Sequence, residues 1–340
     1  MADLPLVSVL MPVWNGEAFL AEAIDSVLAQ TLSSFELIVV NDGSLDRTGE
    51  IVARYEQMDG RVRSCSQQNQ GASVALNQGL MLATGKYVAR LDADDVCLPD
   101  RLARQVELLE RDPNLLIVGS AYYLIDEAGQ QIDVYQHPGD DTSIRWKMLF
   151  HNPFCCSSVT FRAEVLRRYG MRYDPHAVPA EDFDMWSRLL EHGRGANLPD
   201  PLLKYRIHPQ QLSSSRGLVM DTMATRISKS NLARLGLCLP EEDVRIMRQL
   251  YNGWPQRLTR PELRLCRQQL RALELFARQP DMVPEALWRL HRIWLKRLLL
   301  LARAQPRDLW AAGLLNELLQ LMARCPTALA PRRVFPIGGA

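Results

Sequence analysis

Residues 85–95 read GKYVARLDADD, and this stretch decides how the first half of the chain is organised. Its apolar run has the length and character of a buried strand, and it leads directly into three carboxylates, Asp92, Asp94 and Asp95. Like charges this close repel one another, and each costs free energy to desolvate beside a core. Because side chains alternate in an extended chain, Asp92 and Asp94 can face the same side. The stretch therefore predicts a strand with a ligand-binding acidic cluster at its carboxyl end.

Strand-like and helix-like segments alternate on both sides of this stretch. Strand-like runs occupy residues 6–12, 35–44, 61–67, 86–92 and 115–125, and helical spacing occupies residues 17–30, 46–58, 72–83 and 98–109. This order predicts an α/β fold with a mostly parallel sheet and helices on both faces. In such sheets ligands bind beyond the carboxyl ends of the strands, where VNDGS (40–44) and LDADD (91–95) are expected.

Two changes of character divide the rest of the chain. From Asp126 to about Ser215 the pattern loosens, with loops, aromatic residues and a second acidic cluster, AEDFDMW. Beyond Arg216 strand signals vanish, and Leu and Arg dominate. We therefore expect an α/β domain over residues 1–215, divided near 125/126, an α-helical C-terminal region over 216–330, and a flexible tail at 331–340.

Composition limits the class of protein. With a net charge of +1, the chain has no excess of positive charge for binding nucleic acid, so no nucleic-acid partner is expected. Seven cysteines show no C-x-x-C spacing, which favours a reduced, cytoplasmic setting. The N-terminal segment has no basic stretch before its apolar run, and no apolar run approaches the ~20 residues of a spanning helix. We expect neither a signal peptide nor a membrane span.

The sequence lacks a glycine-rich phosphate loop. There is no G-x-G-x-x-G, and GLMLATGKY (79–87) has one residue too many for a P-loop and places Tyr87 where Ser or Thr should bind magnesium. Gly85 is better explained as a helix C-cap. A bound pyrophosphate would then need a divalent cation held by carboxylates, and oxygen ligands suit Mg²⁺ or Mn²⁺. The alternative use of the aspartates, capping the next helix, is better served by Asp100.

Several motifs resemble one known family. SVLMPVWNG (8–16), VNDGSLDRT (40–48), NQGASVALNQGL (69–80) and GKYVARLDADD (85–95) closely resemble the nucleotide-sugar-binding half of family-2 glycosyltransferases, which have the GT-A fold. The resemblance continues through NPFCCSSVTFRAEVL (152–166), YDPHAVPAEDFDMWSRL (173–189) and YRIHPQQLS (205–213), and covers about residues 5–213. It makes residues 5–125 the nucleotide-sugar half and 126–215 the acceptor and base half.

The activity that this resemblance implies is an inverting transfer of a sugar from a nucleotide diphosphate. We expect a UDP-sugar donor, a saccharide or lipid-linked acceptor, and Mn²⁺ or Mg²⁺ as cofactor, in surface polysaccharide or glycoconjugate biosynthesis. A nucleotidyltransferase is a poorer interpretation, because its glycine- and arginine-rich N-terminal loop is absent. A non-catalytic nucleotide-sugar-binding or scaffold subunit is the other alternative, and Asp94 and Asp182 argue against it.

The resemblance assigns the nucleotide contacts residue by residue. Pro12, Val13 and Trp14 match the segment lining the base pocket, and Trp14 is either a stacking ring or a buried anchor. Asp42 matches the aspartate that accepts a hydrogen bond from the base. Leu76 stands where an arginine is frequent, so any contact from that arginine must come from elsewhere. Three further residues match positions near the nucleotide: Asn69, Gly71 and Asn77.

The resemblance also assigns the acidic residues. Asp94 matches the metal-binding aspartate of a DxD motif, Asp92 is expected near the ribose or metal shell, and Asp95 near the sugar. Asp182 matches the catalytic base, although acids here could simply favour a helix N-terminus. His208 matches a metal-shell histidine in some relatives, but a histidine before proline is equally typical of a loop. Cys156 stands where relatives often have histidine.

The C-terminal region contains one amphipathic segment, residues 283–303. Its apolar stripe consists of Leu287, Leu290, Trp294, Leu298 and Leu301, and the opposite side carries Arg289, Arg292, Lys296 and Arg303. We expect the stripe to pack within the protein or in a homodimer. The alternative is peripheral contact with an anionic membrane surface, at the inner face of the cell membrane, where lipid-linked acceptors reside.

Overall fold

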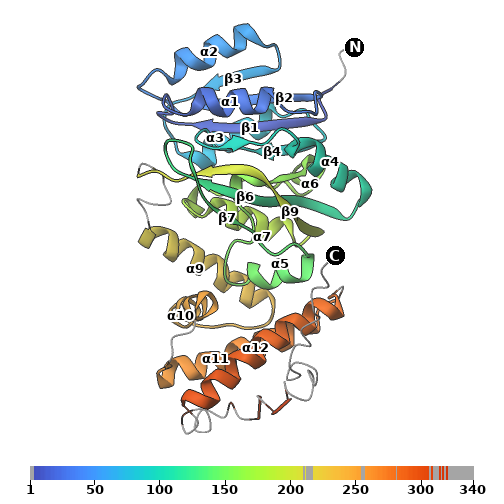
Figure 1. Cartoon of the computed structure of the whole chain (residues 1–340), viewed down its shortest axis with the longest axis vertical. Coiled ribbons are helices and arrows are strands. Elements are labelled where there is room, and N and C mark those ends of the chain that lie inside the picture. The colour runs from blue at the N-terminus through green and yellow to red at the C-terminus, as the bar shows by residue number, and fades with distance from the viewer. Residues whose placement is uncertain are drawn as a thin grey trace, which may run out of the picture. The chain divides into compact units, whose positions relative to one another are not determined.

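A computed structural model describes residues 4–209, 211, 217–253, 257–280, 282–305, 308, 314, 316–317 and 319–320. The expected tail at 331–340 lies outside the described residues. The chain separates into two compact units, Met1–Ser228 and Lys229–Ala340 (Figure 1). The division falls inside helix α9 (Gly217–Arg234), a little after the change of composition at Arg216.

One mixed sheet forms the centre of the first unit. Its strands among the described residues run in the order β3-β2-β1-β4-β8-β6-β9-β5, and β7 pairs with β6. The strands are β1 (Val7–Val13), β2 (Phe35–Asn41), β3 (Val62–Ser66), β4 (Tyr87–Arg90), β5 (Val96–Cys97), β6 (Leu115–Ile125), β7 (Gln131–Tyr135), β8 (Thr160–Arg162) and β9 (Arg194–Arg206). β1 to β4 are mutually parallel, and β8 runs antiparallel between β4 and β6.

Helices cover both faces of the sheet because alternate residues of its central strands point to opposite sides. On β1, Val9 and Met11 join one core, which also receives α1 (Leu20–Leu28), α2 (Thr48–Met58) and α4 (Arg101–Arg111). Leu10 joins the other core. That core receives α3 (Ala72–Leu82), α5 (Asp141–Met148), α6 (Ala163–Tyr169) and α7 (Glu181–Leu189). The expected α/β organisation is confirmed.

Gly85 has a different structural role from the one predicted. Helix α3 ends at Leu82 and its C-cap is Ala83, so Gly85 lies in the turn that leads to β4. A Cβ at Gly85 would lie 2.6 Å from the backbone nitrogen of Ser8, closer than real Cβ atoms come. Glycine is therefore required by the close approach of two backbones, and the prediction of a helix cap was wrong.

Asp100 occupies the predicted N-cap position of α4, but its side chain makes no capping hydrogen bond. Its Oδ1 accepts instead from the hydroxyl of Thr31, at 3.1 Å. Asp100 therefore occupies the expected N-cap position without capping the helix. Its backbone does not have the extended conformation of a usual N-cap.

The segment after Asp126 contains more regular structure than its sequence indicated. Besides α5 to α7 it includes β7, β8, β9 and two 3₁₀ turns, η1 (Cys156–Ser158) and η2 (Pro175–Ala177). β9 was missed because Gly195, Pro199 and Pro201 interrupt its alternation. The strand is held by pairing with β6 and β5, which join it from distant parts of the chain.

The second unit is helical, as expected for the C-terminal region. It contains α10 (Glu241–Asn252), α11 (Arg260–Ala277) and α12 (Pro284–Ala304), with α10 packed on α11 and α11 on α12. The apolar stripe of α12 is buried at Leu290, Trp294, Leu298 and Leu301. Of its other members, Leu287 is half-buried, and Arg292 on the opposite side is also partly covered. No described helix is both long and apolar enough to cross a membrane.

Candidate active site

The loops that follow β1 and β2 are bound to each other. The Asn15 side chain accepts a hydrogen bond from the backbone N–H of Leu45 at 2.9 Å, and the N–H of Gly16 donates to the Thr48 hydroxyl at 2.9 Å. Trp14, at the end of β1, is 56% exposed, which rules out a buried anchor. Pro12 is half-buried, and Val13 is buried beneath the loop. The predicted base-pocket segment therefore presents one free aromatic ring beside a fixed loop.

Asp42 lies at the end of β2 and organises the loop before α3. Its Oδ1 accepts from the side chain of Gln67 at 2.7 Å and from the N–H of Gln70 at 2.9 Å. Its Oδ2 accepts from the N–H of Gly71 at 2.8 Å. Asn69 is exposed on this loop. The structure thus brings Asp42, Asn69 and Gly71 together, next to the loop that carries Trp14.

Asn77 joins the two parts of the first unit. Its Nδ2 donates to the carbonyl of Tyr173 at 2.8 Å, and its Oδ1 accepts from the N–H of Tyr173 at 2.9 Å. Both polar atoms of the side chain are therefore used within the protein. Asn77 positions Tyr173, and its contact with the nucleotide stays a prediction.

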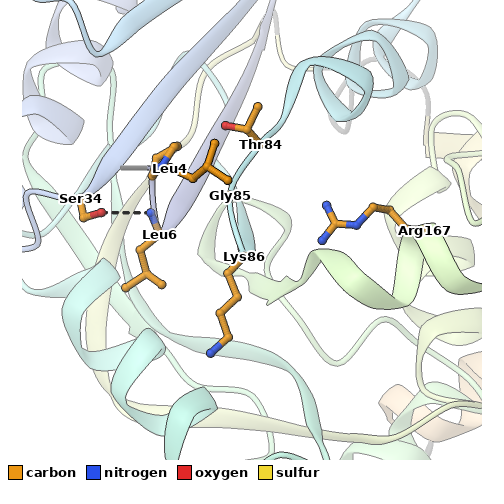
Figure 2. Close-up of a pocket in the computed structure, with 8 residues that line it drawn as sticks. Leu4, Leu6, Ser34, Thr84, Gly85, Lys86 and Arg167 are labelled. Atoms are coloured by element: carbon orange, nitrogen blue, oxygen red, sulfur yellow. Dashed lines mark hydrogen bonds between the residues drawn. The ribbon is translucent and has the colours of Figure 1, made fainter. Parts of the chain in front are cut away.

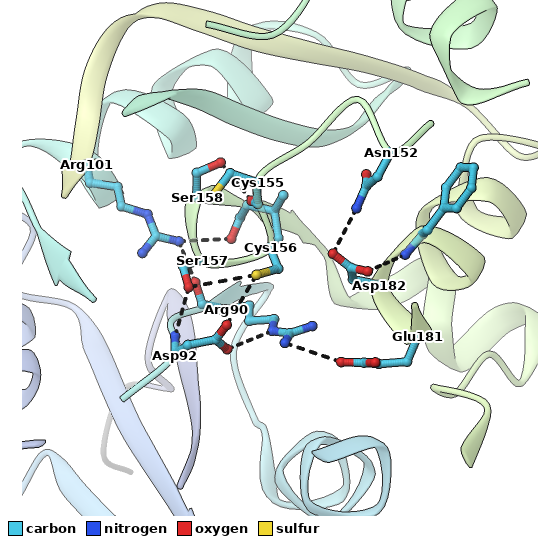
Figure 3. Close-up of polar contacts among 12 residues, drawn as sticks. Arg90, Asp92, Arg101, Asn152, Cys155, Cys156, Ser157, Ser158, Glu181 and Asp182 are labelled. Carbon is cyan, nitrogen blue, oxygen red and sulfur yellow. Dashed lines mark hydrogen bonds and ion pairs between the residues drawn. The ribbon is translucent and has the colours of Figure 1, made fainter. Parts of the chain in front are cut away.

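Asp92 is fixed by three neighbours (Figure 3). Its Oδ1 accepts from Nε of Arg90 at 3.1 Å, and its Oδ2 accepts from the thiol of Cys156 at 3.2 Å. Its backbone N–H donates to the hydroxyl of Ser157 at 3.1 Å. Cys156 therefore has a polar contact with the acidic cluster.

Asp94 and His208 meet across the site. Nε2 of His208 lies 2.9 Å from Oδ2 of Asp94, and the imidazole packs against the ring of Phe19. Burial raises the pKa of Asp94, the charge of Asp92 raises it further, and the contact with His208 lowers it. His208 is therefore more than a loop residue, although its predicted metal contact is not tested by this geometry.

The chemistry of this pair fits a divalent cation. A carboxylate oxygen and an imidazole nitrogen are both ligands for such ions, and Mg²⁺ commonly combines one or two carboxylates with substrate phosphates. Within the described part of the chain, His, Cys, Asp and Glu side chains do not form a group of three that could hold a metal. Asp94 and His208 would thus need oxygen atoms from a substrate or water to complete a coordination shell.

Asp95 faces the protein. It is 1% exposed, and its Oδ1 accepts from the N–H of Arg206 at 2.9 Å. Arg206, also buried, donates through Nε to the carbonyl of Asp94 at 2.9 Å and through Nη2 to Glu22 at 2.6 Å. These contacts hold the DxD loop against the end of β9. The contact of Asp95 with a sugar stays a prediction.

Asp182 lies in the first turn of α7, opposite Asp92. Its Oδ2 accepts from Nδ2 of Asn152 at 2.8 Å, and its Oδ1 accepts from the N–H of Phe183 at 2.7 Å. Burial raises the pKa of Asp182 to about 7, and the adjacent Glu181 raises it while Arg90 lowers it. A carboxyl group that titrates near neutral pH can accept a proton during a reaction and release it afterwards.

Arg90 connects the two acidic clusters. From β4 its guanidinium pairs with Asp92 at 3.1 Å and with Glu181 at 3.5 Å (Figure 3). Sequence reasoning missed Arg90, together with Asn152, Ser157 and Arg206. The available signal was a charged residue inside an otherwise apolar strand, YVAR, since a cation there is costly unless it is paired.

A pocket of about 500 Å³ lies at the amino ends of strands β1, β2 and β4. Its lining comes from the residues before β1, β2 and β4, with Arg167 of α6 (Figure 2). The lining residues are Leu4, Pro5, Leu6, Ser34, Thr84, Gly85, Lys86 and Arg167. Its lining includes no residue of either acidic cluster, so this pocket is separate from them. Lys86 is already paired with Glu110 at 2.6 Å.

Comparisons with known proteins agree with this geometry. The family model described as glycosyl transferase family 2 matches residues 8–170. An uncharacterised glycosyltransferase of Haemophilus influenzae is 34% identical over 241 residues, covering 68% of this chain and 75% of that protein. The amylovoran biosynthesis glycosyltransferase AmsE of Erwinia amylovora is 32% identical over 216 residues, covering 62% and 80%.

Solved structures confirm the GT-A fold. Residues 1–349 of S. aureus TarS, in complex with UDP-GlcNAc, align with a TM-score of 0.57 at 18% identity, covering 92% of this chain and 91% of that one. The mannosyltransferase PcManGT of Pyrobaculum calidifontis, in complex with GDP-Man and Mn²⁺, aligns with a TM-score of 0.55 at 20% identity, covering 97% and 88%. With one acidic cluster after the carboxyl end of β4 and a second at the start of α7, joined through Arg90, the chain belongs to glycosyl transferase family 2.

Proposed function

We propose that this protein is an inverting glycosyltransferase that moves a sugar from a UDP-sugar to a hydroxyl group of a saccharide or lipid-linked acceptor. The observation that carries the proposal is the position of Asp182, a buried carboxyl group with a raised pKa, next to Glu181, which Arg90 joins to Asp92 of the DxD motif. A binding or scaffold subunit has no use for such a base. Surface polysaccharide or glycoconjugate assembly is the proposed setting, and AmsE is a relative that is named for polysaccharide biosynthesis.

The reaction is a single displacement. The acceptor oxygen forms a bond to the anomeric carbon while the bond from that carbon to the diphosphate oxygen breaks, and its electron pair leaves with the nucleotide. The acceptor proton passes to Asp182, and Asn152 orients the carboxylate through the hydrogen bond at 2.8 Å. One displacement inverts the anomeric configuration, so no covalent nucleophile is required.

The loops after the carboxyl ends of β1, β2 and β4 are the proposed binding site of the donor. Trp14 is placed to stack on the base, and Asp42 with the loop at Asn69 and Gly71 is placed to hold the nucleoside. Asp94 and His208 would hold a divalent cation, Mn²⁺ or Mg²⁺, which supplies positive charge for the leaving diphosphate. TarS was crystallised with UDP and UDP-GlcNAc, and PcManGT with GDP-Man, so guanosine donors belong in any test.

The location of the reaction is part of the same proposal. A cytoplasmic enzyme would meet a lipid-linked acceptor at the inner face of the cell membrane, through peripheral contact or through a homodimer that uses the C-terminal helices. These partners are proposed from the chemistry of the acceptor.

Release of nucleoside diphosphate tests the proposal. Nucleotide sugars are first ranked by thermal stabilisation of the purified protein with Mn²⁺, and the best donor is then assayed with and without saccharide acceptors. We expect release that depends on the acceptor and a product with inverted configuration by NMR. Stabilisation without any acceptor-dependent release would favour the binding subunit, and a product with retained configuration would exclude the single displacement.

A further inference from the structure

A buried cation stands between the two acidic clusters of the site. Arg90 is 5% exposed, and its ion-pair partners come from separate places: Asp92 from the loop after β4, and Glu181 from the start of α7. Figure 3 shows the guanidinium lying between these two carboxylates. Glu181 is itself only 6% exposed and precedes the proposed base in the sequence.

Stability alone does not explain this arrangement. Desolvating two buried charges costs about as much as their attraction returns, and apolar pairs of similar size often stabilise a fold equally well. The pair is also incompletely satisfied, because Nη1 of Arg90 and Oε2 of Glu181 are both buried without a hydrogen-bond partner. The pair is therefore weak evidence of a stabilising role, and a functional role for its charges can be tested.

We propose that Arg90 is a positioning residue that keeps Asp182 ionised, and that Glu181 opposes it, so that the pair sets the proton affinity of the base. This inference rests on the proposed function. A positive charge close to a carboxylate favours its ionised form, and a neighbouring carboxylate disfavours it. In a poorly hydrated site both effects are larger than in water.

The surroundings of Asp182 are mostly acidic. Glu181 precedes it on α7, and the charge of Asp92, in the loop after β4, also acts on it. The charge of Asp182 acts in turn on the hydroxyl of Tyr173, in the segment before η2. Arg90 reaches the same space from β4, with its guanidinium 5.9 Å from the centre of the Tyr173 ring. Asn152 adds a neutral hydrogen bond. Burial, Glu181 and Asp92 raise the pKa of Asp182, and Arg90 lowers it.

Removing the charge of Arg90 or of Glu181 should therefore shift the pKa of Asp182 in opposite directions. We expect the acidic limb of the kcat profile to shift to higher pH in Arg90→Gln and to lower pH in Glu181→Gln, each by about one pH unit. Arg90→Lys keeps the positive charge, so the midpoint of the acidic limb should stay at the wild-type pH. Turnover can still fall, because lysine cannot reproduce both ion pairs of the guanidinium. The double variant Arg90→Gln/Glu181→Gln should return close to the wild-type midpoint.

A purely structural role would give a different result. Loss of packing lowers the folded fraction and the turnover of both single variants and leaves the midpoint unchanged. Unshifted midpoints, or shifts in the same direction, would overturn the proposal. If Arg90→Gln does not fold, Glu181→Gln and Arg90→Lys still test the proposal. A Glu181→Gln variant whose kcat profile has the wild-type midpoint is enough to reject the proposal.

A second readout does not need transferase activity. The Asp182 carboxyl can be titrated by carbon-13 NMR in protein labelled at aspartate, with Asp182→Asn to assign its signal. The same opposite shifts are expected in Arg90→Gln and Glu181→Gln. If no nucleotide sugar supports transfer, the proposed function fails while this titration still decides the role of the ion pair.

Discussion

The imidazole Nε2 of His208 lies 2.9 Å from Oδ2 of Asp94, although the two residues are 114 positions apart. The contact joins the DxD loop to the segment after β9, which is held there by Arg206. One carboxylate and one imidazole thus meet at the carboxyl edge of the sheet, and the pair can be tested directly for a role in binding a cation.

Removing either partner should weaken the effect of metal on donor binding. UDP is expected to raise the melting temperature more with Mn²⁺ than with EDTA, because a cation held by Asp94 and His208 would attract the diphosphate. Asp94→Asn should abolish this difference, and His208→Ala should reduce it. Asp100→Asn, a nearby exposed aspartate whose side chain does not cap α4, is the matched control and should behave as wild type. An undiminished metal effect in Asp94→Asn would remove that residue from the site.

Asp182→Asn should lose transfer and keep the donor. Asparagine preserves the shape and can still face Asn152, but it cannot take the acceptor proton. Turnover should fall by about a hundredfold or more, with the affinity for nucleoside diphosphate nearly unchanged. Asp184→Asn provides the control on the same helix, because Asp184 pairs with Arg188 at 2.7 Å and should tolerate the change. Full activity of Asp182→Asn would point to Glu181 as the next candidate.

The same substitution should change how stability depends on pH. Because folding raises the pKa of Asp182 from 3.8 to about 7, the folded protein holds a proton that the unfolded chain releases at lower pH. Stability is therefore lost as pH rises between these values, and Asp182→Asn removes that loss. The melting temperature of the variant minus that of wild type should therefore rise by at least about 2 °C from about pH 5 to about pH 8. A difference that stays constant over this range would contradict the raised pKa.

Trp14 and Trp294 should respond to substitution in opposite ways. Trp14 is 56% exposed, so Trp14→Ala is expected to leave the melting temperature almost unchanged and to weaken UDP binding roughly 5- to 100-fold, the effect of losing a stacked base. Trp294 is 2% exposed in the helical unit, so Trp294→Ala should cost about 3–5 kcal/mol of stability through a cavity. Isothermal titration with UDP, together with thermal unfolding, separates the two effects. Unchanged UDP affinity in Trp14→Ala would exclude stacking.

The C-terminal helices should bind vesicles weakly. The stripe at Leu290, Trp294 and Leu298 is already buried within the helical unit, which leaves little apolar surface for lipid. Flotation with anionic and neutral vesicles is the measurement, with Arg289, Arg292 and Lys296 changed to Gln as the comparison variant. Strong, salt-sensitive flotation that this variant loses would make the region a membrane anchor. Truncation before Val283 should instead expose the surface that α12 covers, and give insoluble protein.

The first half of the fold could be predicted because its signals are local. β1 and β2 are mostly apolar runs, and each is followed by a helix with one apolar face, so the period of the sequence changes where the structure changes. The acidic cluster at Asp92 and Asp94 was also visible, since charges directly after a buried strand are unusual. These features depend on neighbours a few residues apart.

The rest depends on contacts between distant residues. β9 was not predicted, because Pro199 and Pro201 hide its strand character until β6 pairs with it. Arg90 is visible in the sequence as a charge in the strand YVAR, but its role depends on Glu181, which α7 brings beside it. Asp95 shares its motif with Asp94 but is turned inward by the backbone of Arg206, an orientation that spacing alone does not reveal.

The position of β8 limits how this enzyme could be recombined with its relatives. β8 belongs to the later half of the first unit, yet it sits between β4 and β6 of the earlier half. The Asn77 side chain, in turn, is bonded to the backbone of Tyr173. A chimera joined at residues 125/126 would therefore combine a sheet and an inserted strand that were not selected together. Residues on both sides of 125/126 should therefore be exchanged as one block that extends beyond α7.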